Sequence, residues 1–181
     1  MQSLPIRKRW KLTPISEKFI TISEWLTRKK KAYDDAVPVL KKALSLNNNH
    51  AGAHFNLGVI YAEKGMTGEA IDEYNEVLKL TPDDLAALYN RGVLHLENGN
   101  LHDASADMKK IIERNPKLAA ARYKLGDIYK KQGQIDDAIT AYKQALEISP
   151  EMKEALRSLE DAYWIKERQT KKQMDEGGKI Q

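Results

Sequence analysis

Apolar residues recur at helical spacing along most of the chain. Between residues 119 and 150 they form two groups, one on each side of Gly133. The groups are Tyr123, Leu125, Ile128 and Tyr129, then Ala138, Ile139, Tyr142, Ala145 and Leu146. Residues three and four apart share one face of an α-helix, so each group predicts an amphipathic helix. We expect Gly133 to turn the chain between the two helices and Pro150 to stop the second one.

The same arrangement occurs three times in succession. The blocks Ala51–Asp84, Leu85–Leu118 and Ala119–Met152 are each 34 residues long. In register they share glycine at the eighth and fifteenth positions, alanine at the twentieth and proline at the thirty-second: Gly58, Gly92, Gly126; Gly65, Gly99, Gly133; Ala70, Ala104, Ala138; Pro82, Pro116, Pro150. A fixed period of this kind predicts a stack of helix pairs.

The shared small residues indicate how the two helices of a pair meet. Glycine at the eighth position and alanine at the twentieth allow close approach, and larger side chains fill the space around them. The side chains predicted to fill it are Leu57, Tyr61, Tyr74, Leu88, Met108, Leu125, Tyr129 and Tyr142. Asp136 and Asp137 stand where a second helix begins, and carboxylates there favour the positive end of the helix dipole.

With small residues at positions 8 and 20, bulky ones at 4, 7, 11 and 24, and proline at 32, the blocks resemble the tetratricopeptide-repeat family. Position 27, which is small in that family, holds Val77, Ile111 and Ala145, so the third block alone fits it strictly. The resemblance implies an all-α fold, a right-handed superhelical solenoid of antiparallel helix pairs. For function the resemblance implies a protein that binds other proteins.

Upstream of the blocks, residues 16–50 are predicted to form a degenerate helix pair. The stretch 33–36 aligns with 135–138, which places a second helix there, and Ser16–Lys31 shows the apolar face of a first helix. Pro38 falls early in the second helix, so we expect a distorted pair. Residues 1–15 form a basic arm.

Downstream, residues 153–176 are predicted to form a helix that caps the last repeat, followed by a frayed tail over 177–181. Met152, Leu156, Leu159 and Tyr163 give this helix one apolar face, as a terminal cap requires. Trp164 lies beside that face. We favour its partial burial by the repeats over the alternative, an anchor for a partner.

In the family that the blocks resemble, first helices line a concave groove through positions 2, 5, 9, 12 and 13. The predicted groove residues at positions 5, 6 and 9 are Phe55, Asn56, Val59, Tyr89, Asn90, Val93, Tyr123, Lys124 and Asp127. Ala62, Leu96 and Lys130 follow one turn on, at position 12. An aromatic groove of this kind is suited to a peptide or an amphipathic helix. Asn56 and Asn90 each offer a donor and an acceptor to an extended backbone.

One narrower function of the family is not expected. Members that grip the carboxylate end of heat-shock chaperones use lysine, asparagine and arginine at fixed repeat positions. The corresponding residues are Phe55, Val59, Asn90, Ala120 and Lys124. Asn90 and Lys124 match the pattern and the other three do not, so a carboxylate clamp is not predicted.

Neither an enzyme site nor a cofactor or metal site is predicted from the residue pattern. The sequence has no cysteine, which excludes disulfides, thiolate metal sites and cysteine nucleophiles. His50 and His54 have metal-ligand spacing, but His50 precedes the predicted helix and His54 occupies a packing position. The acidic pairs 83–84 and 136–137 are interpreted as helix starts.

Charge is unevenly distributed along the chain. Residues 1–31 hold nine Lys and Arg against two Glu, a net charge of +7, whereas residues 32–152 have a net charge of −4. The basic arm, Arg7, Lys8, Arg9 and Lys11, could contact an anionic protein, a lipid headgroup or nucleic acid. No apolar run follows it, so we expect neither a signal peptide nor a membrane span. We expect a cytoplasmic protein, with contact to a membrane or large assembly as an option. A signal trimmed before Met1 stays open.

Three functions remain, in order of preference. The first is a scaffold that assembles or organises a larger protein complex. The second is a peptide-binding adaptor or co-chaperone that uses the aromatic groove. The third is a nucleic-acid-associated factor, which needs the basic arm and Lys29, Lys30 and Lys31 to bind phosphates. We expect a protein partner rather than a nucleic acid. Self-association of the chain stays open.

Overall fold

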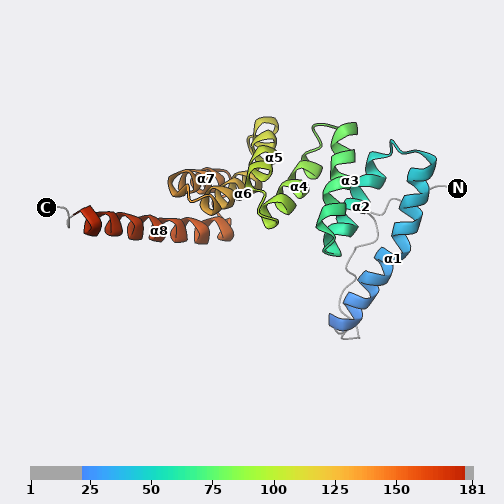
Figure 1. The fold of residues 1–181 in the computed structure, drawn as a ribbon, viewed down its shortest axis with the longest axis horizontal. Helices are drawn as coiled ribbons and strands as arrows, with labels where there is room; N and C mark the ends of the chain where they lie inside the picture. The colour runs from blue at the N-terminus through green and yellow to red at the C-terminus, as the bar shows by residue number, and fades with distance from the viewer. Residues whose placement is uncertain (1–21, 178–181) are drawn as a thin grey trace. The chain divides into compact units, whose positions relative to one another are not determined.

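The computed structural model describes residues 22–177, and over this range it contains eight α-helices and no strand (Figure 1). The chain divides into two compact units, with the boundary between Ala36 and Val37, so the first helix contributes residues to both units. The helices are α1 Ile22–Leu46, α2 Ala51–Glu63, α3 Thr67–Leu80, α4 Leu85–Glu97, α5 Leu101–Arg114, α6 Ala119–Lys131, α7 Ile135–Ile148 and α8 Lys153–Gly177. The all-α expectation is confirmed.

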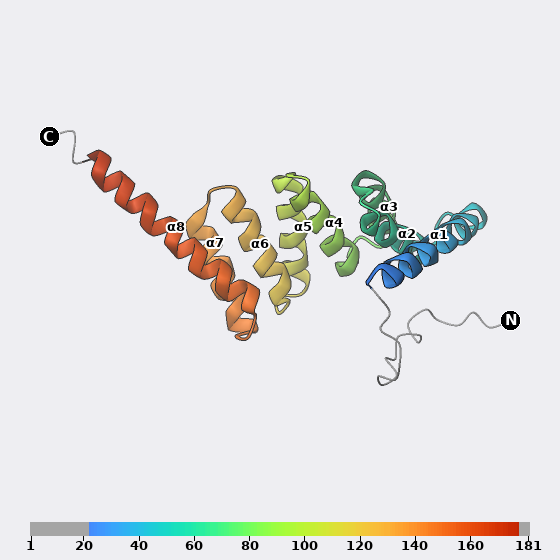
Figure 2. The same ribbon diagram turned by 90° about the horizontal axis from the view of Figure 1, so that it is seen from below.

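Helices α2 to α7 form three antiparallel pairs, one for each block of the sequence. Within the second unit α2 packs on α3, α4 on α5 and α6 on α7, and each pair contacts the next one along the chain (Figures 1 and 2). The turn inside each pair contains a glycine with positive φ: 73° at Gly65, 80° at Gly99 and 77° at Gly133. Other residues rarely adopt this conformation, so the repeating glycine fixes where each first helix ends.

Acidic residues stand at the starts of helices, where the sequence predicts them. The Asp84 carboxylate caps α4 by accepting hydrogen bonds from the Ala86 and Ala87 amides, at 3.0 and 2.9 Å. Asp136 and Asp137 occupy the first turn of α7, near the positive end of its dipole. These carboxylates therefore stabilise helix ends, as predicted.

The two helices of a pair meet at the glycine of the eighth position. A Cβ atom placed on Gly126 would lie 2.5 Å from Cε1 of Tyr142, and one on Gly58 would lie 2.8 Å from Cε1 of Tyr74. Such distances are shorter than van der Waals contact, so no larger residue fits without a shift of the partner. Tyr74 and Tyr142 are themselves fully buried. Glycine and tyrosine thus set the spacing of the pair together.

The interior of the second repeat contains an ion pair. Arg91 donates two hydrogen bonds to the buried Asp107 carboxylate, from Nε at 3.0 Å and from Nη2 at 2.6 Å. Its Nη1 donates to Oδ1 of Asn75 at 2.6 Å. The third repeat has leucine at the position of Arg91. The apolar pattern of the sequence did not reveal this pair.

A polar contact also lies inside the first repeat. The ring of His54 is buried, and its Nδ1 lies 2.6 Å from Oε2 of Glu73. Its Nε2 donates to the Asn48 carbonyl at 2.9 Å. His54 therefore takes the packing position that the repeat predicts, and joins α2 both to α3 and to the loop that precedes α2.

The helix pair predicted over residues 16–50 is corrected by the structure. In the described residues 22–50 the structure has one continuous helix, α1 Ile22–Leu46, with Pro38 inside it. In repeat register, Lys31 stands where Gly65, Gly99 and Gly133 turn the chain. Lysine disfavours the positive φ that the turn requires, so the helix continues. Val37, Leu40 and Leu44 of α1 pack against the core of the first repeat.

Helix α8 covers the last repeat and extends past α7 (Figures 1 and 2). Ala155 and Ala162 are fully buried, whereas residues 166–174 are exposed. The helix includes Gly177, which the sequence assigned to the tail; residues 178–181 lie outside the described part. The favoured burial of Trp164 is wrong, because 55% of the residue is exposed and the Arg168 guanidinium lies 4.5 Å from its ring centroid.

Candidate functional site

Three aromatic side chains, Phe55, Tyr89 and Tyr123, form a ladder on the first helices of the three repeats. Each is half-buried. Phe55 contacts Tyr74 edge to face at a centroid distance of 5.7 Å, and Tyr123 lies 5.9 Å from Tyr142. The inner edge of the ladder is thus anchored in the cores, and Nζ of Lys124 lies 5.1 Å from the centroid of the Tyr123 ring.

A hollow of about 450 Å³ lies between the first two repeats. Helices α2 and α4 form its walls, and Tyr74 of α3 reaches its floor. The lining residues are Val59, Ala62, Glu63, Tyr74, Tyr89, Asn90, Val93, Leu94 and Glu97. We call this the α2–α4 hollow. It is the part of the predicted groove where the ladder and a concave surface coincide.

The structure divides the predicted groove residues into two sets. Val59, Tyr89, Asn90 and Val93 line the α2–α4 hollow. The other five do not line it: Phe55, Asn56, Tyr123, Lys124 and Asp127. Asn56 is exposed and the other four are half-buried. The hollow therefore covers the first two repeats, whereas the sequence predicted a groove over all three.

Asn90 has a role inside the repeat stack. Its amide nitrogen donates a hydrogen bond to the Tyr74 hydroxyl at 3.2 Å. Burial raises the pKa of Tyr74, and the hydrogen bond from Asn90 opposes that rise. Part of the hydrogen-bonding capacity of Asn90, which was predicted for an extended ligand backbone, is used to hold the floor of the hollow.

In the third repeat the polar groove positions bond to one another. The Asp127 carboxylate accepts a hydrogen bond from the Tyr142 hydroxyl at 2.9 Å, and Nζ of Lys124 lies 3.6 Å from its other oxygen. Burial and the negative charge of Asp127 raise the pKa of Tyr142 far above its usual range. These contacts tie α6 to α7.

Three residues of the hollow, Glu63, Leu94 and Glu97, were missed by the sequence analysis. Glu63 and Glu97 occupy position 13 of the first two repeats, both are exposed, and both line the hollow. Position 13 belongs to the family groove pattern, so applying it would have found them. Leu96, placed in the groove through position 12, is instead buried in the core that the second repeat shares with the third.

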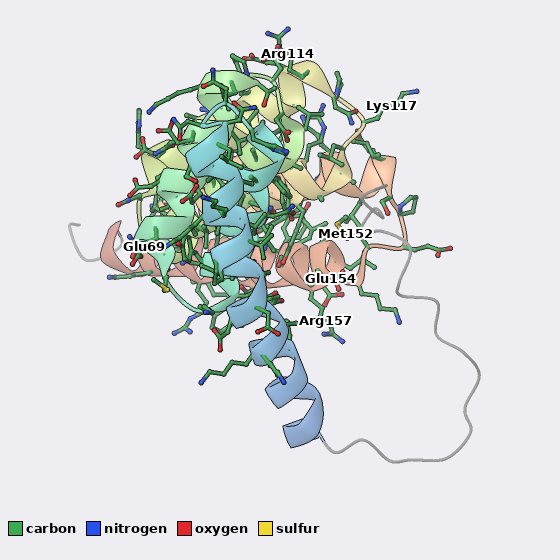
Figure 3. The ribbon with its side chains drawn as sticks, turned by 90° about the vertical axis from the view of Figure 1, so that its right-hand side faces the viewer. Glu69, Arg114, Lys117, Met152, Glu154 and Arg157 are labelled. Carbon is green, nitrogen blue, oxygen red and sulfur yellow. The ribbon has the colours of Figure 1, made fainter. Side chains whose placement is uncertain are left out.

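The aromatic ladder ends at α8. Arg157 takes position 5 on that helix, where the three repeats have Phe55, Tyr89 and Tyr123. Figure 3 shows Glu154 and Arg157 on the first turns of α8, with side chains that extend away from the ribbon. A charged and exposed surface thus follows the aromatic one along the stack.

The remaining candidate chemistry is accounted for as follows. His50 caps α2, because its Nδ1 accepts a hydrogen bond from the Ala53 amide at 3.1 Å. Within residues 22–177 no group of three or more potential metal ligands comes together. In the same part of the chain no helix combines the length and the apolar character needed to cross a bilayer. The predicted basic arm, residues 1–15, lies outside the described residues.

Comparison with known families gives a consistent result. One tetratricopeptide-repeat model matches residues 28–92, and another matches three times, over residues 67–119, 89–153 and 123–170. Together these matches span more than half of the chain. No curated protein matches the sequence.

Several solved structures are similar to this one. A MamA protein superposes with a TM-score of 0.70 and 29% identity, covering 75% of this chain and 74% of that chain. YrrB, described as a TPR protein with an unusual peptide-binding site, gives 0.69 and 23%, with 78% and 73% covered. The first TPR of Spaghetti (RPAP3), bound to the HSP90 peptide SRMEEVD, gives 0.61 and 22%, with 64% and 91% covered. The last two similarities show the fold alone.

Proposed function

Because the chain belongs to the tetratricopeptide-repeat family, we propose that it is a non-catalytic scaffold that binds a segment of a partner protein and holds it within a larger complex. Repeats of this family generally serve protein–protein interaction. The single observation that carries the finer proposal is the α2–α4 hollow, where Val59, Tyr89 and Val93 present apolar surface to the outside.

The hollow has the properties of a preformed binding site. The Gly58–Tyr74 contact and the hydrogen bond from Asn90 to Tyr74 fix its floor. A rigid floor reduces the entropy lost on binding, and aromatic side chains beside aliphatic ones give large contact area at low cost in rotamer freedom. A helix or an extended segment that lays apolar side chains across α2 and α4 would bury this surface.

The residues of the groove argue against capture of a chain end. In the carboxylate-clamp pattern the terminal carboxylate needs lysine and asparagine where this chain has Phe55 and Val59. These side chains offer no donor to an anion. We therefore propose that the ligand is an internal segment of the partner.

Affinity purification followed by mass spectrometry tests the proposal. We expect a tagged full-length chain to retain a defined set of proteins, and Tyr89→Ala to lose them. Tyr163→Ala is the matched control, because Tyr163 is a partly exposed tyrosine on α8, away from the hollow. Circular dichroism shows whether each variant is folded, and Val93→Gln provides a second groove variant. Retention of every partner by folded Tyr89→Ala and Val93→Gln would contradict the proposal.

A peptide-binding adaptor is the second candidate, and the same hollow favours it. The two functions differ in the lifetime of the complex. A scaffold elutes with its partners in size-exclusion chromatography of a gently prepared lysate, whereas an adaptor elutes alone and binds its peptide reversibly. Elution of the chain as a lone monomer under all conditions would favour the adaptor.

A further inference from the structure

We propose that helix α8 has a binding surface of its own, on which Arg157, Trp164 and Arg168 hold an acidic segment of a partner protein that also carries an apolar side chain. The surface lies outside the α2–α4 hollow, so the inference goes beyond the proposed function. It comes from the spacing of these three residues, their exposure and the charges around them.

Arg157, Trp164 and Arg168 lie on one face of α8. Trp164 and Arg168 follow Arg157 by seven and eleven residues, which is close to two and three turns of an α-helix. All three residues are exposed, and Figure 3 shows the side chain of Arg157 extending away from the first turns of the helix. Arg157 stands at position 5, so this face follows the aromatic ladder along the stack.

Trp164 is the apolar centre of the surface. It stands at position 12, where the second repeat has Leu96, and Leu96 is buried in the core shared with the third repeat. Trp164 has 55% of its surface exposed. Tryptophan and arginine are the residue types in which the binding energy of protein interfaces is concentrated. A partner that covers Trp164 therefore buries a large apolar area between two arginines.

The two arginines leave positive charge on both sides of Trp164. Among the residues that the structure describes, neither guanidinium has a carboxylate partner. The Arg168 guanidinium lies over the Trp164 ring, at 4.5 Å from its centroid, and in that position its N–H groups can still donate a bidentate pair of bonds to a carboxylate. Asp161 of the same face is neutralised by Lys130 of α6, at 2.8 Å. The surface is therefore complementary to carboxylates.

The charges of α8 favour a protein segment over a nucleic acid. The helix contains six basic and six acidic residues, so it lacks the continuous basic surface along which a phosphate backbone binds. Arg157 and Arg168 are about 16 Å apart along the helix axis. An extended segment spans this distance with carboxylates about five residues apart. The side chains between those carboxylates lie over Trp164.

Subtractive selection of phage-displayed peptides tests the inference without a known partner. A random library is first depleted on the immobilised full-length variant Arg157→Glu, Trp164→Ala, Arg168→Glu, which removes peptides that bind elsewhere, and is then selected on the wild-type chain. We expect the enriched sequences to have aspartate or glutamate on both sides of an apolar or aromatic residue. The most enriched peptide is synthesised, and its Kd is measured by fluorescence anisotropy.

Matched variants decide the role of the arginines. We expect Arg157→Glu with Arg168→Glu to weaken binding of that peptide about tenfold or more, since two ion pairs are replaced by repulsion. The control is Lys42→Glu with Lys117→Glu, which changes the net charge equally at exposed positions away from α8. It should bind within about twofold of the wild type, because charges beyond a Debye length are largely screened. Trp164→Ala should weaken binding about tenfold as well.

Tryptophan fluorescence locates the bound peptide. In the variant Trp10→Phe, Trp25→Phe the remaining tryptophan is Trp164. Its emission should shift to shorter wavelength when a peptide covers the ring. An unchanged emission at saturating peptide would contradict the proposed surface.

The other outcomes separate this inference from the proposed function. Failure to enrich any peptide, enrichment without an excess of acidic residues, or unchanged affinity for the folded Arg157→Glu, Arg168→Glu variant would overturn the inference. So would a fluorescein-labelled oligo-dT that binds the chain through the same two arginines, since the surface would then be one for nucleic acid. Peptides that need Tyr89 and not Trp164 would overturn it and leave the α2–α4 hollow intact as a site. Peptides that need Trp164 and not Tyr89 support it whatever becomes of the proposed function.

Discussion

The second and third repeats have the same helix pair and different interiors. In the third, Gly126 packs against the ring of Tyr142, and Leu125 and Ala141 are apolar. In the second, Gly92 packs against the flexible end of Met108, and Arg91 and Asp107 replace the leucine and the alanine. Both pairs nonetheless have helices of the same length, joined by the same positive-φ glycine turn.

The difference separates what the fold requires from what it tolerates. It requires a glycine opposite a large side chain, because that contact sets the distance between the helices. It tolerates an ion pair in place of apolar residues when both charges are present and bonded. Removal of one partner leaves the other charge without its bonds, so the two interiors should respond very differently to single substitutions.

The largest effect is expected from Asp107→Ala. Arg91 would lose two hydrogen bonds and keep the one to Asn75, and its side chain is 23% exposed. Loss of one partner of a buried pair costs about 3 kcal/mol of unfolding free energy, toward the lower end of the usual range because water can reach Arg91. Urea denaturation followed by circular dichroism measures it. The corresponding Ala141→Gly in the third repeat should cost less, and the reverse order would contradict the comparison.

A methyl group at the eighth position should distinguish the two contacts. In Gly126→Ala the new Cβ meets the rigid Tyr142 ring at 2.5 Å, whereas in Gly92→Ala it meets the mobile Met108 terminus at 2.5 Å. Overpacking costs about 1–3 kcal/mol and the better helix propensity of alanine returns about 1. We expect a net loss of up to about 2 kcal/mol for Gly126→Ala and a smaller one for Gly92→Ala, whose new Cβ would also lie 3.1 Å from Cβ of Asp107. Equal thermal unfolding midpoints for the two variants would show that ring rigidity does not matter.

A smaller effect is expected from Tyr142→Phe. The variant keeps the ring against Gly126 and removes the hydroxyl that donates to Asp127 at 2.9 Å. We expect a loss of about 1 kcal/mol, because Asp127 keeps its contact with Lys124 and partial access to water. The double-mutant cycle with Asp127→Asn isolates the interaction. A coupling energy near zero would mean that the hydrogen bond adds nothing to the pairing of α6 with α7.

The smallest effect is expected when the second repeat receives the interior of the third. Arg91→Leu with Asp107→Ala removes both charges together and copies Leu125 and Ala141. Replacing a buried ion pair by apolar residues is often neutral or stabilising, so the stability should lie within about 1 kcal/mol of the wild type or above it. A loss as large as that of Asp107→Ala alone would show that the pair stabilises the repeat in a way that apolar packing cannot replace.

Most of the fold could be predicted from the sequence, because its determinants are local and repeated. Gly65, Gly99 and Gly133 specify turns, and Asp84 caps a helix through its own neighbours. The single helix α1 follows from Lys31, which stands at the position where the repeats have the turn glycine. A missing turn glycine is a weaker signal than a present one, so the sequence predicts a pair of helices there.

The candidate site was predictable in part. Val59, Tyr89, Asn90 and Val93, which their repeat positions predict for the groove, line the α2–α4 hollow, and Glu63 and Glu97 were within reach of the same argument. The exposure of Trp164 could not be predicted from the sequence. A helix at the end of a stack has no following repeat to cover its neighbouring face. Whether a residue of α8 is covered depends on what packs beside it, and sequence spacing alone does not contain that information.

The sequence by itself determined the helix pairs and their turns, because each depends on residues close together in the chain; the groove on the first helices was implied by the resemblance to the repeat family. The tertiary structure decided which of the predicted groove positions are exposed and which bond within the stack. Leu96 is buried and Glu97 beside it is exposed, Asn90 holds Tyr74, and Asp127 holds Tyr142. The physical reason is that side chains from neighbouring helices compete for the same space and the same hydrogen bonds, and only their packing in three dimensions settles the outcome.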